Sequence, residues 1–362
     1  MARKKILSVV GTRPNFMKTG PVQAALSRHP DEFETVLVHT GQHYDAAMSD
    51  IFFEELGIGP PDHMLDVGSG THAQQTARVM ERLEPVLEAE RPDLVLVPGD
   101  VNSTLAAALV AAKLEISVGH IEAGLRSFDR TMPEEINRIL TDQVSEHLFI
   151  HSPEAEQHLL SEGCKPDSIH YVGNTMIDTL VALRPRIDDE GSIEKRGLER
   201  GGFVLVTLHR PALVDGPLIE DVLSQLAALA GEMPVVFPAH PRTQKNMERI
   251  VARDAPGLEV VDPLGYLEFL NLLSGAAAVL TDSGGIQEEA TFLGIPCLTL
   301  RDNTERPITV KMGTNVLLGL RPDRISELPA LVEEVRAREV TVPPKWDGEA
   351  ADRIVEVLLG AR

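Results

Sequence analysis

The sequence predicts an α/β protein built from two doubly wound domains, each a parallel sheet with helices on both faces. The chain has 362 residues, more than one hydrophobic core usually organises, so its length favours two domains. Short β-rich apolar runs also alternate with helical patterns in two successive series, which is typical of parallel sheets. In chain order the runs lie at 5–10, 35–40, 94–98, 118–122 and 147–150, and then at 203–208, 235–240, 258–261, 278–282 and 296–300. We therefore expect two Rossmann-like domains.

The segment 184–202 lies between the two series and is polar, charged and glycine-containing, as interdomain connections are. We expect an N-terminal domain over 1–183 and a C-terminal domain over 203–345. After the Pro-Pro pair at 343–344, apolar residues recur at helical spacing, which predicts a terminal helix over 346–362 packed on the body. Two doubly wound domains facing each other would bring the carboxyl ends of both sheets to one cleft, where such folds bind ligands.

Charge and composition exclude several classes of protein. The formal net charge is −21 and the cations are scattered, which argues against a nucleic-acid partner. No apolar run approaches the roughly 18 residues of a membrane span, and the N-terminal apolar stretch ends at a Gly-Thr-Arg-Pro turn instead of a cleavage site. We therefore expect a cytoplasmic protein without a membrane partner. In that compartment Cys164 and Cys297 are expected to stay unpaired and structural.

The first candidate ligand site follows the first predicted strand. The segment 11–18, GTRPNFMK, opens a helix and places Arg13 and Lys18 near a helix N-terminus that attracts anions such as a diphosphate. One glycine stands where the dinucleotide fingerprint needs three, so the usual mode of dinucleotide binding is not expected. The alternative interpretation is an ordinary turn with surface cations.

A second candidate site repeats this geometry in the second domain. The segment 281–290, TDSGGIQEEA, is a strand end, a small turn and a helix start. Small residues at Ser283, Gly284 and Gly285 allow the backbone to approach a diphosphate. Glu289, further along the helix, can accept the hydroxyls of a ribose. The alternative is a capped helix with solvated acids.

Carboxylates form the third candidate group: Asp100, Glu122 and Glu134 stand at or near strand ends of the first domain. Acids at the ends of adjacent strands converge, and like charges raise some pKa values enough for proton transfer near neutrality. Any one of them could instead be a helix cap or an arginine partner. Glu135 and Arg138 are three apart on one predicted helix, which indicates a structural pair.

Histidines end two predicted strands of the second domain. His209 with Arg210, and His240 with Arg242, stand at the carboxyl edge of that sheet, which favours an anionic ligand over purely structural roles. There is no HExxH, no DxD and no closely spaced His/Cys set, so we expect neither a metal nor another cofactor. His120 and Glu122 share one strand face, but two ligands do not make a metal site.

Several blocks together resemble the UDP-N-acetylglucosamine 2-epimerase family. The blocks are GTRPNFMK, GQH at 41–43, PGDVNST, GHIEAGLRS, MPEEINR, LHR, TDSGGIQEEA and RDNTERP at 301–307, in matching order over about residues 5–320. The resemblance implies a fold like that of GT-B glycosyltransferases. In the non-hydrolysing branch it implies interconversion of UDP-GlcNAc and UDP-ManNAc by eliminating UDP across C1 and C2 and adding it back. Thr12-Arg13-Pro14 speaks against the hydrolysing branch.

The resemblance also implies roles for individual residues. Asp100, Glu122 and Glu134 look like the acid/base carboxylates, and His209 looks like the group that assists UDP departure. The implied UDP-binding residues are Arg13, Lys18, His240, Phe269, Ser283, Gly284, Gly285 and Glu289, with Phe269 near the uracil. The implied partner is a UDP-sugar substrate. The sequence does not fix the oligomeric state and leaves a homodimer open.

Departures from the family pattern keep alternatives open. Pro211-Ala212 replaces the usual Arg-Glu after His209-Arg210, so a related substrate, UDP-2,3-diacetamido-glucuronic acid, remains an alternative, and stretches near 41–58 and 125–142 resemble that branch. Asp45 stands where members activated by a second UDP-GlcNAc carry an amide, and 67–74 lacks an arginine, so we expect no effector site. From other classes, a GT-B glycosyltransferase and a catalytically silent nucleotide-sugar module are the alternatives.

Overall fold

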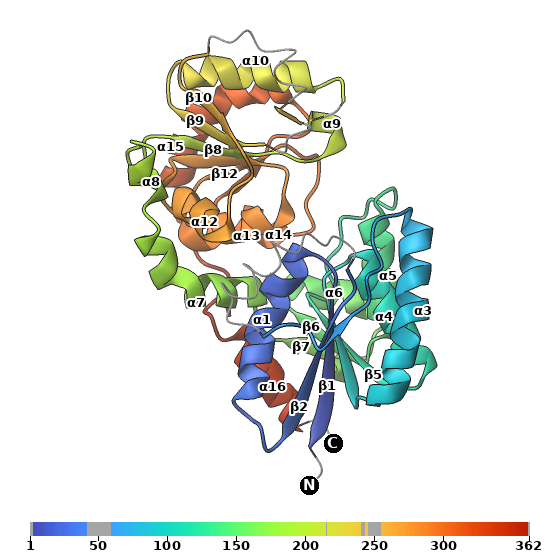
Figure 1. The fold of residues 1–362 in the computed structure, drawn as a ribbon. Helices are drawn as coiled ribbons and strands as arrows, with labels where there is room; N and C mark the ends of the chain where they lie inside the picture. Colours follow the sequence, from blue (N-terminus) through green and yellow to red (C-terminus); the bar gives the residue numbers. More distant parts are fainter. Residues whose placement is uncertain (1–2, 42–58, 215, 240–242, 245–254, 361–362) are drawn as a thin grey trace. The chain divides into compact units, whose positions relative to one another are not determined.

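The computed structural model describes residues 3–41, 59–214, 216–239, 243–244 and 255–360. By its internal contacts the chain divides into two compact units, which are coloured along the chain in Figure 1. Unit 1 comprises Met1–Ala182 together with Pro344–Arg362, and unit 2 comprises Leu183–Pro343. The C-terminal segment therefore returns to the unit in which the chain begins.

Unit 1 contains a seven-stranded, fully parallel sheet in the order β3-β2-β1-β4-β5-β6-β7. The strands are β1 (Lys4–Val10), β2 (Phe33–His39), β3 (His63–Met64), β4 (Leu94–Pro98), β5 (Ser117–Ile121), β6 (His147–Ile150) and β7 (Ile169–Tyr171). β1 lies inside the sheet because it pairs with β2 on one side and β4 on the other, as in a doubly wound sheet.

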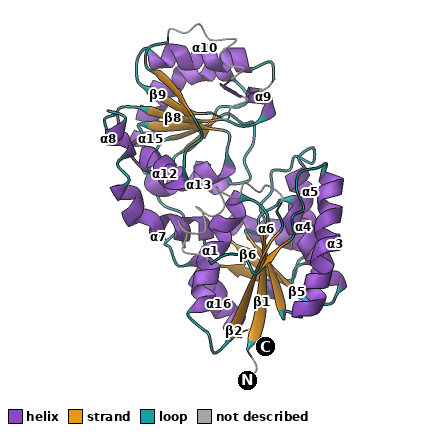
Figure 2. Ribbon diagram, in the orientation of Figure 1, coloured by secondary structure: helices purple, strands orange, loops and turns teal. Residues whose placement is uncertain are grey.

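Helices cover both faces of this sheet (Figure 2). They are α1 (Arg13–Ser27), α3 (His72–Glu90), α4 (Asn102–Lys113), α5 (Pro133–Val144), α6 (Pro153–Ser161) and α16 (Ala350–Gly360), while α7 (Thr175–Asp189) leads into unit 2. One core joins α3 and α4 to the sheet through residues such as Val79, Leu83 and Val95. The opposite core joins α1 and α16 to it through Val22, Ile354 and Leu358.

The terminal helix is therefore part of unit 1. Its N-terminus is capped by Asp178 of α7, whose carboxylate accepts the N–H groups of Ala350 at 3.1 Å and Ala351 at 2.7 Å. Burial raises the pKa of Asp178 to about 6, although the two hydrogen bonds favour the ionised form and lower the pKa.

Unit 2 contains a six-stranded parallel sheet in the order β10-β9-β8-β11-β12-β13. The strands are β8 (Val204–Thr207), β9 (Val235–Pro238), β10 (Leu258–Val261), β11 (Ala278–Thr281), β12 (Cys297–Thr299) and β13 (Asn315–Leu317). The helices are α8 (Ser192–Lys195), α9 (Pro211–Val214), α10 (Ile219–Ala230), α12 (Tyr266–Gly275), α13 (Gly284–Leu293), α14 (Pro307–Lys311) and α15 (Leu328–Ala337). A core of β8, β9 and β11 residues packs against α10 and the segment 325–332.

The predicted fold class is confirmed, with two parallel sheets and interleaved helices. All ten predicted strands are present, and the strands without a sequence signal are β3, β7 and β13, which are two or three residues long. The segment expected as a connection, 184–202, contains the end of α7 and all of α8, and its contacts belong to unit 2. In the part of the chain that the structure describes, every helix is too short or too polar to cross a membrane.

Candidate active site

The predicted site residues of unit 1 follow three adjacent strands at the carboxyl edge of the sheet. Gly11 follows β1, Asp100 comes two residues after β4, and Glu122 follows β5. The strand order reverses between β1 and β4, which is where doubly wound sheets bind ligands. Signals that are far apart in the sequence therefore meet at one edge.

Glu122 forms a buried ion pair with Lys18 of α1. The two residues are 8% and 7% exposed, so each neutralises a charge that would otherwise be costly to bury. Glu122 has a φ of 71°, and a left-handed backbone in a residue with a side chain costs on the order of 1–3 kcal/mol. Such strain is concentrated at functional sites, and here the ion pair with Lys18 holds the carboxylate at the point where the chain leaves β5.

Gly99 makes room for this pair. A Cβ on Gly99 would lie 3.1 Å from Lys18 Nζ and 3.4 Å from Glu122 Oε2, and Gly99 has a φ of 64°. Both the close approach and the left-handed backbone favour glycine. The Gly99 turn therefore carries the chain from β4 past the Lys18–Glu122 pair to Asp100.

Asp100 is held by α5. Its carboxylate is paired with Arg138, and its backbone carbonyl accepts the side-chain amide of Asn137 at 2.9 Å. Arg138 also pairs with Glu135 at 2.5 Å, so the predicted structural pair is present. The Asp100 side chain remains 26% exposed, which leaves it accessible from solvent.

Glu134 and Glu135 are neighbours with different environments. Glu135 is buried and accepts the backbone N–H groups of Ser127 at 2.9 Å and Phe128 at 2.8 Å, which fixes the loop before α5. Glu134 is only partly buried, and its carboxylate makes no hydrogen bond or ion pair with any described residue. Glu134 is therefore the available carboxylate of the two.

The start of α1 is less open to an anion than the sequence predicts. Asn15 Oδ1 accepts the N–H groups of Gly11 and Thr12, each at 3.1 Å, so these two donors are already occupied. Pro14 has no N–H to offer. Arg13 begins α1, but its side chain lies outside the described residues.

In unit 2, His209 and Asp282 face each other across the point where the strand order reverses, between β8 and β11. His209 Nδ1 lies 2.7 Å from Asp282 Oδ1. Asp282 Oδ2 accepts the N–H groups of His209 at 3.0 Å and Arg210 at 2.7 Å. Burial alone would raise the pKa of Asp282, but these hydrogen bonds and the His209 charge lower it, so the carboxylate is ionised. An ionised Asp282 requires His209 Nδ1 to donate, and the exposed ring then presents Nε2.

The N-terminus of α13 carries the Ser283-Gly284-Gly285 turn, and its first N–H groups have no side-chain cap. Arg306 lies directly over this turn, since a Cβ on Gly284 would fall 2.4 Å from Arg306 Nη1. Arg306 Nε pairs with Glu288 at 2.8 Å, which orients the guanidinium. Uncapped N–H groups beside a cation form an anion-binding arrangement, and it is more complete than the one at α1.

Two further predicted residues of unit 2 lie on facing helices. Glu289 of α13 is buried, and its Oε1 accepts the hydroxyl of Tyr266 of α12 at 2.7 Å. Phe269, one turn further along α12, is partly exposed and available to contact a flat ring. His240, Arg242 and Asp45, to which the sequence also assigned roles, lie outside the described residues.

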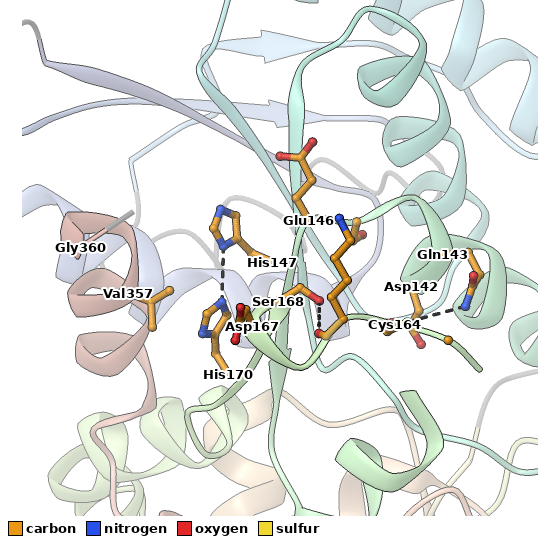
Figure 3. Close-up of a pocket in the computed structure, with 13 residues that line it drawn as sticks. Asp142, Gln143, Glu146, His147, Cys164, Asp167, Ser168, His170, Val357 and Gly360 are labelled. Carbon is orange, nitrogen blue, oxygen red and sulfur yellow. Dashed lines mark hydrogen bonds between the residues drawn. The ribbon is translucent and has the colours of Figure 1, made fainter. Parts of the chain in front are cut away.

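A pocket elsewhere in unit 1 is drawn in Figure 3 and contains none of the predicted site residues. It lies beside β6 and β7, where His147 Nδ1 and His170 Nε2 are 3.5 Å apart. Burial lowers the pKa of both histidines, so both rings are neutral near pH 7. His170 therefore offers a control position for substitutions in this unit.

Comparison with known proteins decides the family. The family model for UDP-N-acetylglucosamine 2-epimerase matches residues 24–359, which is nearly the whole chain. This chain belongs to the UDP-N-acetylglucosamine 2-epimerase family. The resemblance predicted from the sequence blocks is thereby confirmed, and so is the isomerase class.

Relatives of two kinds are found among these epimerases. The chain is 40% identical over 371 residues to a UDP-N-acetylglucosamine 2-epimerase of Methanococcus maripaludis, and the match covers 99% of both chains. It is 46% identical over 329 residues to a UDP-2,3-diacetamido-2,3-dideoxy-D-glucuronate 2-epimerase of Pseudomonas aeruginosa, covering 89% of this chain and 90% of the relative. A crystal structure of the Methanocaldococcus jannaschii UDP-GlcNAc 2-epimerase with UDP-GlcNAc and UDP matches with a TM-score of 0.86 at 38% identity, over 99% of this chain and 100% of that one.

Sequence reasoning missed two partners in this epimerase. The TDSGGIQEEA motif by itself indicates no role for Asp282, which precedes the turn and holds His209. The RDNTERP motif by itself indicates no role for Arg306. After β12 the chain folds back and places Arg306 over Gly284, and no local sequence pattern predicts this contact.

Proposed function

We propose that this chain interconverts UDP-GlcNAc and UDP-ManNAc without hydrolysing them. The observation that carries the proposal is the full-length similarity to epimerases of this name, combined with the strained, ion-paired Glu122 beside Asp100 in unit 1. Inverting C2 requires a proton to leave one face of the carbon and another to arrive on the opposite face. Two independently fixed carboxylates meet that requirement.

The proposed reaction begins with elimination. A carboxylate takes the proton from C2, the C2–H electron pair forms the C1–C2 double bond, and the C1–O bond breaks as UDP leaves with its electrons. UDP then returns to C1 while an acid delivers a proton to the other face of C2, so atoms and charges balance. Asp100, Glu122 and Glu134 are the proposed acid/base groups of unit 1.

Unit 2 supplies the proposed groups for the departing UDP. His209, oriented by Asp282 through Nδ1, presents Nε2, which in the protonated ring donates to a diphosphate oxygen. The uncapped N-terminus of α13, with Arg306 beside it, would hold the same diphosphate. Glu289 is proposed to accept ribose hydroxyls, and Phe269 to contact the uracil. Lys18 would act through its pair with Glu122, and Arg13 and His240 complete the UDP-binding set that the sequence predicts.

Two observations favour a second substrate. The relative with 46% identity is named for a diacetamido-glucuronate, and this chain carries Pro211-Ala212 beside His209. The second proposed function is therefore the same C2 inversion on UDP-2,3-diacetamido-glucuronic acid. The chemistry at C2 is unchanged, so only the groups that contact C3 and C5 would differ.

One experiment separates these proposals. The protein is incubated with each UDP-sugar in deuterated water, without added metal or nicotinamide, and C2 is followed by NMR. We expect the C2 epimer of UDP-GlcNAc with deuterium at C2, because the new proton comes from an exchangeable acid. Formation of the epimer without deuterium would contradict the elimination mechanism. Turnover of UDP-2,3-diacetamido-glucuronic acid alone would show that this sugar, and not UDP-GlcNAc, is the substrate.

We also propose that the chain acts as a homodimer through unit 1. Large apolar side chains stay exposed on and beside α5 and α6: Phe128 at 72%, Ile136 at 41%, Leu140 at 44% and Leu160 at 42%. Ile136 and Leu140 are four residues apart and share one helix face. Glu135 fixes the backbone of Phe128, so its exposure is built into the fold. A second copy of the chain is the proposed cover for this patch.

A further inference from the structure

Behind the Gly99 turn lies a buried charge network that the proposed reaction does not use directly. His120 of β5 is fully buried, and its Nε2 lies 2.7 Å from the carbonyl oxygen of Gly99. Its Nδ1 lies 2.6 Å from Asp142 Oδ1, on α5. Both ring nitrogens of His120 are therefore within hydrogen-bond distance of an oxygen.

The partners of Asp142 determine its charge. Asp142 Oδ2 lies 2.7 Å from Arg126 Nη2 and accepts the N–H of Gly124 at 3.2 Å. A carboxyl group that faces a buried guanidinium and accepts a backbone N–H is stabilised as the anion. Asp142 is thus an acceptor on both oxygens and has no proton to give to His120.

The hydrogen-bond inventory then fixes the protonation state of His120. A carbonyl oxygen can only accept, so Nε2 must carry a proton, and an ionised carboxylate can only accept, so Nδ1 must carry one as well. An imidazole with both nitrogens protonated is a cation. His120 is an imidazolium inside the core of unit 1.

Charge balance supports this state. Arg126 also pairs with Glu162, at 2.8 Å and 2.5 Å. Burial alone would lower the pKa of Arg126, but Glu162 and Asp142 together raise it. With His120 protonated the network holds two cations, His120 and Arg126, and two anions, Asp142 and the 26% exposed Glu162.

The Gly99 peptide is consequently fixed from β5 at both ends. Its N–H donates to Ile121 O at 3.0 Å, and its carbonyl accepts from His120. Gly99 approaches the Lys18–Glu122 pair on one side and leads directly into Asp100 on the other. The position of Asp100 relative to Glu122 therefore depends on the hydrogen bond from His120.

We propose that His120 is a permanently protonated positioning residue, locked by Asp142, that sets the Asp100 turn against Glu122. The proposal rests on the proposed epimerase function for its kinetic consequence and on the hydrogen-bond geometry alone for its protonation state. Two carboxylates that serve opposite faces of one carbon must keep a fixed separation, and a shift of about 1 Å can cost a hundredfold in rate.

The first test is NMR of the ¹⁵N-labelled wild-type chain at about pH 8, where an exposed histidine is neutral. We expect both ring nitrogens of His120 to carry protons, and one ring nitrogen of His170 to carry none. An unprotonated nitrogen on His120 would overturn the proposal. This measurement needs no substrate, so it stands even if the proposed epimerase function fails.

The second test is His120→Asn, with His170→Asn as the matched control in the same unit. We expect kcat per folded molecule to fall roughly tenfold to a hundredfold in His120→Asn, with little change in KM or UDP affinity, and no change in the control. If His120 had a purely structural role, the substitution would lower only the fraction of folded protein and the midpoint of unfolding. Unchanged kcat in folded His120→Asn would therefore contradict the positioning role.

Discussion

At the scale of single residues, the three carboxylates of unit 1 differ in ways that their sequence motifs do not reveal. Glu122 is buried, strained and paired with Lys18. Asp100 is partly exposed and paired with Arg138, and Glu134 has no side-chain partner among the described residues. The three carboxylates proposed as acid and base groups therefore lie in different environments.

We predict that Asp100→Asn, Glu122→Gln and Glu134→Gln each lower kcat by at least about a hundredfold, the low end of acid/base contributions. UDP affinity should stay within a few-fold, because the three carboxylates are proposed to move protons at C2 and not to hold the diphosphate. Steady-state kinetics and UDP titration of each variant test this, with Glu154→Gln on α6 as a control. Near-full activity in one variant would remove that residue from the set.

A buried histidine near the same edge gives a pH dependence of stability. His39, at the end of β2, stacks on Phe16 with ring centroids 5.2 Å apart, and burial lowers its pKa to about 4. A folded-state pKa below the unfolded value of about 6.5 means that the folded state resists protonation. The resulting stability is complete above pH 6.5 and is lost as the pH falls through 4.

We therefore predict that the free energy of unfolding declines from about pH 6.5 to pH 4 more steeply in the wild type than in His39→Asn, by on the order of 3 kcal/mol at most. Urea unfolding at several pH values measures the difference. His29→Asn, in the loop after α1, is the control and should keep the wild-type slope. Parallel curves for wild type and His39→Asn would show that other groups carry the dependence.

At the scale of elements, the alternation of strands and helices was predictable, because long apolar runs fill central strands that are buried on both faces. The edge strands β3 and β7 were not, since they are two and three residues long and take their register from a neighbour. The helical content of 184–202 was missed because tertiary contacts fix it: Asn271 accepts the N–H groups of Ser192 and Ile193. Likewise, residues at strand ends were identified, but the Asp142–His120 contact joins residues 22 apart in sequence and no motif reports it.

The return of the C-terminal segment to unit 1 depends on one close approach. Gly173, just after β7, has a φ of 102°, and a Cβ there would lie 2.0 Å from the carbonyl oxygen of Lys345. Trp346 then donates from Nε1 to His151 O at 2.9 Å and is 2% exposed. The segment 344–346 thus packs directly against the backbone that follows β6 and β7.

We predict that Gly173→Ala lowers the free energy of unfolding by more than about 2 kcal/mol. The new methyl group must displace the backbone of Lys345, and the alanine must adopt a left-handed φ. Gly163→Ala is the matched control, since Gly163 has a φ of 88° but nothing within 4 Å of its Cβ position. Gly163→Ala should lower the free energy of unfolding by about 1 kcal/mol, because only the left-handed φ disfavours the alanine. Equal losses in the two variants, measured by urea unfolding, would mean that the contact with Lys345 contributes nothing.

At the scale of the whole molecule, the proposed homodimer accounts for the apolar side chains that are exposed on and beside α5 and α6. Scattered exposed apolar residues are common, but Ile136 and Leu140 share one face of α5 and Phe128 packs edge-on against His158 of α6. Glu135 accepts the backbone N–H of Phe128, and Arg126 pairs with Glu162, so hydrogen bonds and ion pairs hold the backbone near these side chains. A rigid apolar patch loses little entropy when a partner covers it.

We predict that light scattering after gel filtration gives twice the 39.5 kDa mass of one chain for the wild type and a single-chain mass for Ile136→Lys/Leu140→Lys. Two lysines on the contact face would bury unpaired charges, which outweighs the apolar gain of about 1.5–3 kcal/mol for each covered side chain. Leu320→Lys, at a 38% exposed position of unit 2, is the control and should remain a dimer. A single-chain mass for the wild type, or a dimer that survives both lysines, would place the subunit contact elsewhere or remove it. If the monomeric double variant keeps the wild-type kcat, the dimer is not needed for turnover and each chain holds a complete site.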